Sequence, residues 1–208
     1  MEIAIIGAGN VGAALGGRLT QKGHRIRYGV PNPADEKYAA LESGASSTVT
    51  TPAEAAKPAG VVLLATPWGV TQQAIEALGS LVGKILVDCT NPIRADFSGL
   101  EVGHTTSGAE IVAGWAKGAS VVKCFNQTGS NNMAEPAYDG RPSVMFAAGD
   151  DADAVRTIAS LARDVGFDAV ELKGLHMARQ LEELAWLWIE MAAKQGFGRD
   201  FAFAMLGR

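Results

Sequence analysis

Three glycines near the amino terminus have the spacing of a phosphate-binding turn. Gly7, Gly9 and Gly12 follow the apolar run 3–6 directly and open a stretch with helical periodicity. In such a turn the first glycine permits a tight bend, the second lets the backbone approach a pyrophosphate, and the third lets the helix pack on the strand. The helix amino terminus offers unpaired amides and a positive dipole end to the phosphates. The turn predicts dinucleotide binding, with a purely structural glycine turn as the less favoured alternative.

Polar residues also follow the later apolar runs, in the loops 28–32, 65–68, 90–93 and 125–128. Ligands of open α/β sheets bind at the carboxyl ends of the strands, where these loops are expected. Asn and Thr side chains there can bond ribose hydroxyls or a carboxamide. For Asn91 and Asn126 we favour ligand contact, whereas Asn32 also fits a helix cap before Pro33.

Acid–base machinery is not expected at these strand ends. No Ser/His/Asp group, carboxylate pair or metal cluster can be assembled from them, and His24, His104 and His176 stand apart in the sequence. Hydride transfer between two flat heterocycles requires chiefly alignment and exclusion of water, because the cofactor supplies the reactive atom. We therefore expect no catalytic side chain and no metal ligand.

The elements that must position these residues follow from the alternation of apolar runs and helical stretches, which is typical of a parallel sheet covered on both faces. We predict a Rossmann-type, doubly wound α/β fold with a mostly parallel sheet. Capping boxes at Thr51 and Ser107 and the Asn32-Pro33 pair predict helices over 52–57, 107–116 and 33–43. The predicted strands are 2–6, 24–28, 46–49, 60–65, 84–88, 119–124, 143–148 and 168–172.

The last part of the chain reads as one helix from Gly174 to about Lys194. Its apolar face is broad enough to meet a second surface, and a homodimer interface and burial in the monomer are about equally favoured. We divide the chain into a dinucleotide-binding domain, 1–173, and a helical segment, 174–208. The face is formed by Leu181, Leu184, Trp186, Leu187, Trp188, Ile189 and Met191.

Composition narrows the function classes further. The net charge of −4 over 208 residues argues against a nucleic-acid partner. Cys89 and Cys124 lack metal spacing, and buried structural thiols are favoured over a redox pair. The apolar runs are too short to cross a membrane, and the first strand leaves no room for a leader. These features predict a cytoplasmic protein with no membrane partner.

Several blocks are more specific than the glycine turn, namely 5–12, 64–67, 87–92, 106–110, 122–126, 148–151 and 179–182. Through them the chain resembles the deazaflavin (coenzyme F-420) dependent NADP reductase family over nearly its whole length. The resemblance implies a small helical carboxyl-terminal part, pairing as a dimer, and hydride transfer between NADP(H) and a deazaflavin or flavin. It also implies which residues hold the dinucleotide. The pyrophosphate would be held by Gly7, Gly9, Asn10, Val11 and Gly12, and the site would include Gly29, Val30 and Asn32. The adenosine side would be held by Ala65, Thr66 and Pro67, and the nicotinamide side by Asn91, Pro92 and Asn126.

Two departures from that family concern specificity. The family has Gly-Ser-Arg after its second strand where this chain has Gly29-Val30-Pro31, so the arginine that binds a 2′-phosphate is missing and NAD becomes an alternative to NADP. The Asp or Glu that an NAD site commonly places at the end of this strand is missing as well, which argues against NAD. The family's Gly-Pro-Leu appears as Gly174-Leu175-His176, which suggests His176 near the acceptor.

Two other functions remain open from the residues alone. An imine, pyrroline-carboxylate or hydroxyacid reductase shares the amino-terminal half but requires a partner to complete its pocket. A non-catalytic dinucleotide sensor would use the helix of Trp186 and Trp188 as a ligand-sensitive interface.

Overall fold

The computed structural model describes residues 1–207, which are built around an eight-stranded sheet. Each strand lies within one residue of its predicted position. The central strands β1, β4 and β5 are short apolar runs, which makes their positions clear in the sequence. The strands are β1 (Glu2–Ile6), β2 (Arg25–Gly29), β3 (Ser47–Thr50), β4 (Val61–Leu64), β5 (Ile85–Asp88), β6 (Ser120–Lys123), β9 (Val144–Gly149) and β10 (Asp168–Lys173).

The strand order is β10-β9-β6-β5-β4-β1-β2-β3, and every neighbouring pair is parallel except β6 with β9. The order from β3 to β6 is that of a Rossmann fold, so the predicted mostly parallel, doubly wound sheet is confirmed. The chain crosses from one side of β1 to the other between β3 and β4, which places the topological switch point between β1 and β4.

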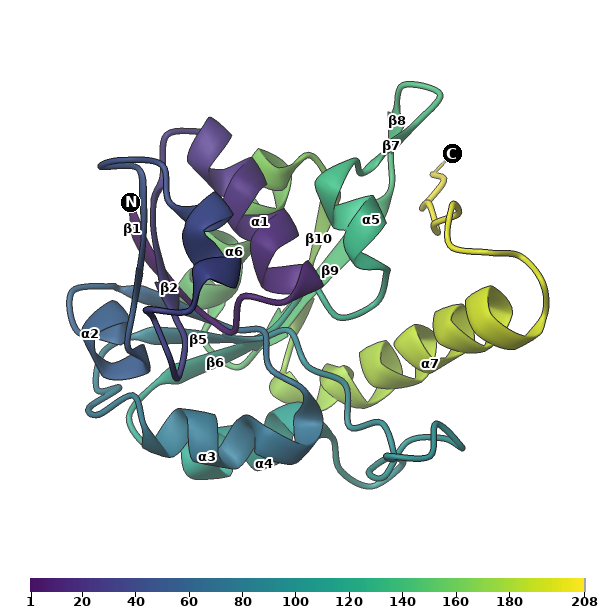
Figure 1. The fold of residues 1–208 in the computed structure, drawn as a ribbon. Coiled ribbons are helices and arrows are strands. Elements are labelled where there is room, and N and C mark those ends of the chain that lie inside the picture. Colours follow the sequence, from purple (N-terminus) through teal and green to yellow (C-terminus); the bar gives the residue numbers. More distant parts are fainter. Residues whose placement is uncertain (208) are drawn as a thin grey trace.

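Helices cover both faces of the sheet (Figure 1). Side chains alternate along β1, so that Ile3 and Ile5 belong to one core cluster and Ala4 and Ile6 to the other. The first cluster includes residues of α1 (Asn10–Gln21), α5 (Ser130–Ala134) and α6 (Ala152–Val165). The second includes residues of α2 (Pro52–Ala56), α3 (Thr71–Glu76) and α4 (Gly108–Trp115).

The capping signals predicted two of three helix starts correctly. The Thr51 hydroxyl accepts from the Glu54 amide at the start of α2, and the Ser107 hydroxyl accepts from the Glu110 amide at the start of α4. The prediction that Asn32 caps a helix over 33–43 is wrong. A 3-10 helix, η1 (Glu36–Leu41), begins later because the Asp35 carboxylate accepts from the Lys37 amide instead. A short hairpin of β7 (Ala137–Tyr138) and β8 (Arg141–Pro142) was not predicted.

The last helix, α7 (Ala178–Lys194), follows the turn η3 (Leu175–Met177) and extends away from the sheet (Figure 1). Trp188 is buried against the chain's own tail: its indole N–H donates to the Phe201 carbonyl at 3.0 Å, and the two rings stack with centroids 5.3 Å apart. Leu187, one position earlier, is 49% exposed. No helix within residues 1–207 is long and apolar enough to span a bilayer.

Candidate functional site

The glycine turn joins β1 to α1 at the carboxyl edge of the sheet. Gly7 has a φ of 97°, and a side chain there would overlap the carbonyl oxygen of Ala65. A Cβ at Gly12 would overlap the carbonyl oxygen of Gly7. A Cβ at Gly9, in contrast, would meet no atom within 4 Å. Gly7 and Gly12 are thus required by the turn itself, whereas the fold leaves open space at Gly9.

The amino terminus of α1 is arranged to receive an anion. Gly9 is its N-cap and provides no side-chain capping bond, and the first turn of the helix holds no acidic residue. The first amides of a helix have no intrahelical partner, so they point at whatever lies before the helix. The open space at Gly9 and these amides fit a pyrophosphate.

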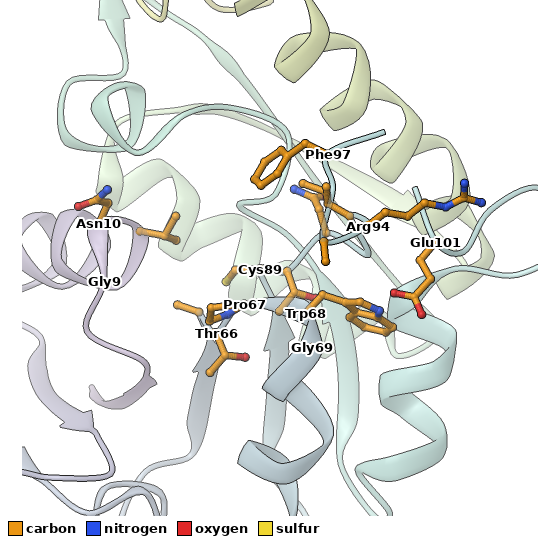
Figure 2. A pocket seen from close by; sticks show the side chains of 16 residues that line it. Gly9, Asn10, Thr66, Pro67, Trp68, Gly69, Cys89, Arg94, Phe97 and Glu101 are labelled. Carbon is orange, nitrogen blue, oxygen red and sulfur yellow. The ribbon is translucent and has the colours of Figure 1, made fainter. Parts of the chain in front are cut away.

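A cleft of about 590 Å³ lies at this helix terminus and continues along the ends of β4 and β5 (Figure 2). This volume lies within the range of small-molecule sites. The cleft is lined by Gly9, Asn10, Val11, Ala65, Thr66, Pro67, Trp68, Gly69, Cys89, Thr90, Asn91, Ile93, Arg94, Ala95, Phe97 and Glu101.

Half of the residues expected at the site line this cleft. They come from the glycine turn, from the loop after β4 and from the loop after β5, as strand-end reasoning predicts. The residues that line the cleft are Gly9, Asn10, Val11, Ala65, Thr66, Pro67 and Asn91, and those that do not are Gly7, Gly12, Gly29, Val30, Asn32, Pro92 and Asn126.

The residues expected after β2 serve the packing of that strand end. A side chain at Gly29 would lie 2.9 Å from the Cα of Pro52, and Val30 is 1% exposed. The Val30 amide donates to the Thr50 carbonyl at 3.0 Å, which continues the β2–β3 ladder. Asn32 is exposed, so its side chain is free to meet a ligand. A cofactor role for these positions stays a prediction.

Asn91 and Asn126 form a reciprocal pair. The side-chain amide of Asn91 donates to the backbone carbonyl oxygen of Asn126 at 2.8 Å. The side-chain amide of Asn126 in turn donates to Asn91 Oδ1 at 3.0 Å. Asn126 also donates to the Leu181 carbonyl of α7. Its own Oδ1 is buried without a partner, as are both polar atoms of Gln127. Such unpaired buried atoms are costly, which is consistent with a ligand that supplies the missing bonds.

An aromatic wall was not foreseen from the sequence. Trp68 lines the cleft and packs against Trp115 of α4, with ring centroids 5.7 Å apart. Phe97 faces the cleft from the opposite side, and the Arg94 side chain extends away from the glycine turn (Figure 2). Trp68 directly follows Pro67 in the chain, so its position after a strand end was the available signal.

A buried ionic cluster lies beneath the loop after β5. Lys123 Nζ is 2.8 Å from Asp88 Oδ2, 2.8 Å from Glu182 Oε1 and 2.6 Å from the Thr90 carbonyl oxygen. The three side chains are at most 1% exposed. Asp88 Oδ1 in turn accepts from the Thr90 amide at 2.9 Å and from its hydroxyl at 2.7 Å. The cluster therefore fixes Thr90, which lines the cleft.

Glu182 connects this cluster to two helices. It lies on α7 and accepts from the amides of Gly108 and Ala109, the first residues of α4, at 2.9 and 3.1 Å. The carboxylate thus satisfies the orphan amides of α4 and complements the helix dipole. Asp88, from the end of β5, and Glu182, from α7, meet at Lys123. Neither lines the cleft, so their role is to position the loop.

The electrostatics of the cluster favour a charged lysine. Burial alone would lower the pKa of Lys123, but the carboxylates of Asp88 and Glu182 outweigh it, and its pKa is raised. Burial raises the pKa of Glu182, against the opposing effect of Lys123 and the Gly108 amide. Because Glu182 accepts bonds from an ammonium and two amides, its ionised form fits the geometry.

Both cysteines are free and buried, as expected for structural thiols. Burial raises the pKa of each thiol well above its ordinary value, so neither is activated as a nucleophile. His176 is exposed and does not line the cleft, and its suggested place near the acceptor stays a prediction.

Known proteins are similar to this chain in sequence and in fold. A model of the family "NADP oxidoreductase coenzyme F420-dependent" matches residues 2–92. A structure from Arthrobacter sp. FB24, for which an F420-dependent NADP-reductase function has been suggested, covers 100% of both chains with 28% identity and a TM-score of 0.87. The hypothetical protein SMa0349 from Sinorhizobium meliloti is 30% identical over 99% of this chain and 94% of its own, with a TM-score of 0.74.

The chain belongs to the coenzyme F420-dependent NADP oxidoreductase family. The enzyme class implied by this membership is an NADP-dependent oxidoreductase. The chain is also similar to the metalloreductase STEAP3 of Rattus norvegicus. The two are 28% identical over 183 residues, which are 88% of this chain. The aligned part is 36% of the relative's length, so the chain spans about a third of that protein.

Proposed function

We propose that this oxidoreductase transfers a hydride between a nicotinamide dinucleotide, NADP(H) in its family, and a deazaflavin or flavin acceptor. The observation that carries the proposal is one continuous cleft that runs from the amino terminus of α1 to the aromatic wall of Trp68. One end fits phosphates and the other fits a flat ring. Such a site aligns two planar partners, which is the main requirement of hydride transfer.

The dinucleotide would be held mostly by backbone. The amides of Asn10 and Val11 would bind the pyrophosphate, and the loop 65–67 would line the adenosine side. Asn91, fixed by Asn126, would meet the nicotinamide end. Asn32 would meet the dinucleotide through its exposed side chain. The remaining predicted positions (Gly7, Gly12, Gly29, Val30 and Pro92) would act by shaping the turn and the strand ends.

The acceptor would lie against Trp68 and Phe97. Both side chains are large and flat, and aromatic rings stack favourably in offset arrangements. The bound dinucleotide supplies the hydride; the chain orients both rings and keeps water from between them. Of the charged lining residues, Arg94 and Glu101 are exposed, so we assign no proton transfer to a side chain.

Steady-state oxidation of NADPH with deazaflavin, FMN and riboflavin in parallel tests this function. Turnover with one of these acceptors is expected. Tight dinucleotide binding without turnover would instead favour a dinucleotide sensor, and turnover only with cyclic imines would favour an imine reductase. Each assay requires a control in which Gly9→Val closes the open space at the turn.

We also propose a cytoplasmic homodimer in which the segment 174–208 forms the contact and residues 1–173 bind the dinucleotide. The half-exposed Leu187 on α7 supports this, because large exposed apolar side chains on one helix face favour association. Sedimentation of Leu187→Asp against the unchanged protein tests it. The variant is expected to sediment as a monomer and the unchanged protein as a dimer. An unchanged sedimentation coefficient would rule the contact out.

A further inference from the structure

The end of β2 decides whether a Rossmann fold prefers NADP, because the 2′-phosphate is bound there by a nearby arginine. We infer that this chain does not select for the 2′-phosphate and binds NAD(H) at least as tightly as NADP(H). The inference rests on the proposed dinucleotide site and concerns its adenosine end. It is argued from where the basic and acidic side chains around β2 lie.

The arginines of β2 are directed to the wrong edge of the sheet. Arg27 Nε donates to Glu2 Oε1 at 2.5 Å, and Arg25 lies 3.9 Å from the same carboxylate. Glu2 is the first residue of β1, and β1 and β2 are parallel. Both guanidinium groups are therefore drawn toward the amino edge, whereas the cleft is at the carboxyl edge.

The segment that follows β2 is acidic. Between residues 28 and 54 the sequence has one basic side chain, Lys37. Lys37 Nζ is 2.7 Å from Asp35 Oδ2, so its charge is already compensated by a neighbour. The acidic residues of the same segment are Asp35, Glu36, Glu42 and Glu54.

Glu54 places a fixed negative charge beside the β2 end. Its carboxylate accepts from the hydroxyls of Thr50 and Thr51, both at 2.6 Å, and these bonds lower its pKa to about 2. Thr50 is paired with Gly29 in the sheet, and Pro52 is in contact range of Gly29. The 2′-phosphate of NADP(H) at the end of β2 would thus meet an ionised carboxylate and no free cation from residues 28–54. The 2′-hydroxyl of NAD(H) carries no charge and would not be repelled.

Isothermal titration of the full chain with NADPH, NADH, adenosine 2′,5′-bisphosphate and AMP tests the inference without any acceptor. NADH and AMP are expected to bind at least as tightly as their 2′-phosphorylated counterparts. NADPH affinity more than about tenfold above that of NADH, the effect of one strong charge-assisted hydrogen bond, would overturn it.

Two variants locate the cause. Pro31→Arg adds a cation at an exposed position after β2 and is expected to raise NADPH affinity about tenfold with NADH affinity unchanged. Pro31→Ala is the matched control for loss of the proline ring, and we expect no change with either nucleotide. Glu54→Gln keeps a residue suited to the α2 capping box and should raise NADPH affinity alone. Equal gains with NADH in these variants would contradict the inference.

The outcomes separate this inference from the proposed function. Binding of both dinucleotides with no turnover on any acceptor would refute hydride transfer and leave the inference supported. Turnover with strict NADPH selectivity would refute the inference and support the function. Failure to bind either dinucleotide would overturn both.

Discussion

Lys123 Nζ lies 2.8 Å from Glu182 Oε1, and this buried contact joins the end of β6 to α7. The same ammonium binds Asp88 and the Thr90 carbonyl, so the loop lining the cleft and the last helix share one cation. Removing one partner of a buried ion pair leaves an uncompensated charge, which is far more costly than a surface pair.

Substitution of the cluster should therefore affect stability asymmetrically. Lys123→Met leaves Asp88 and Glu182 buried without a cation, and we expect a loss of about 3–5 kcal/mol in the free energy of unfolding. Glu182→Gln retains the Lys123–Asp88 pair and should cost clearly less. Urea unfolding followed by tryptophan fluorescence measures both variants. Equal losses would show that the lysine is not the centre of the cluster.

The glycine turn gives a second pair of variants with opposite expected effects. Gly9→Val should fold normally, because a Cβ there meets no protein atom within 4 Å, but should abolish NADPH and NADH binding. Gly12→Ala should be destabilised, because its Cβ would overlap the Gly7 carbonyl. Thermal unfolding and titration calorimetry distinguish the two effects. Undiminished binding by Gly9→Val would remove the pyrophosphate from this turn.

Trp68 should act on the acceptor rather than on the dinucleotide. Trp68→Ala removes the flat wall, and we expect the KM for the acceptor to rise about tenfold, as for a stacking contact of 1–1.5 kcal/mol, with NADPH affinity unchanged. Trp68→Phe is the conservative control and should restore most of the loss. An unchanged acceptor KM in Trp68→Ala would place the acceptor elsewhere.

The contact between Arg179 of α7 and Glu110 of α4 should make stability depend on pH. Arg179 donates twice to Glu110, at 2.9 and 2.6 Å, and holds the pKa of that carboxyl below its ordinary value of 4.5. A carboxyl with a lowered folded pKa contributes stability above its unfolded pKa and loses it as the pH falls through the folded value. Arg179→Gln should cost about 1 kcal/mol at neutral pH, since the pair is partly exposed.

That difference between Arg179→Gln and the unchanged protein should vanish in acid, below the lowered pKa of Glu110. Urea midpoints measured across the acidic range give the comparison. A difference that persists after Glu110 is protonated would mean that Arg179 stabilises α7 through packing alone.

The strands and the glycine turn were predictable because they depend on local patterns. Short apolar runs indicate the central strands, and the Gly7, Gly9 and Gly12 spacing indicates the turn. Asn32 and Asp35 can both cap a helix, and the local sequence does not decide between them. The prediction therefore placed the cap at Asn32, whereas the structure has it at Asp35.

The remaining parts of the site depend on long-range contacts. Glu182 reaches Lys123 from a helix far along the chain, and no local pattern indicates that meeting. A weaker signal was present, since Asp88 and Lys123 end two apolar strands with opposite charges and are paired in register. Phe97 lines the cleft from a loop with a positive φ, which sequence periodicity does not describe.

Single-turnover transfer of a labelled hydride tests the central claim most directly. The protein is mixed without oxygen with deazaflavin and NADPH deuterated at either face of nicotinamide C4, and the reduced acceptor is analysed by mass spectrometry. Carbon replaces the reactive ring nitrogen in a deazaflavin, so a transferred deuteride is retained. We predict that one of the two deuterated cofactors labels the acceptor fully and the other leaves it unlabelled. Absence of label from both, with NADPH bound, would contradict hydride transfer to a deazaflavin in this cleft.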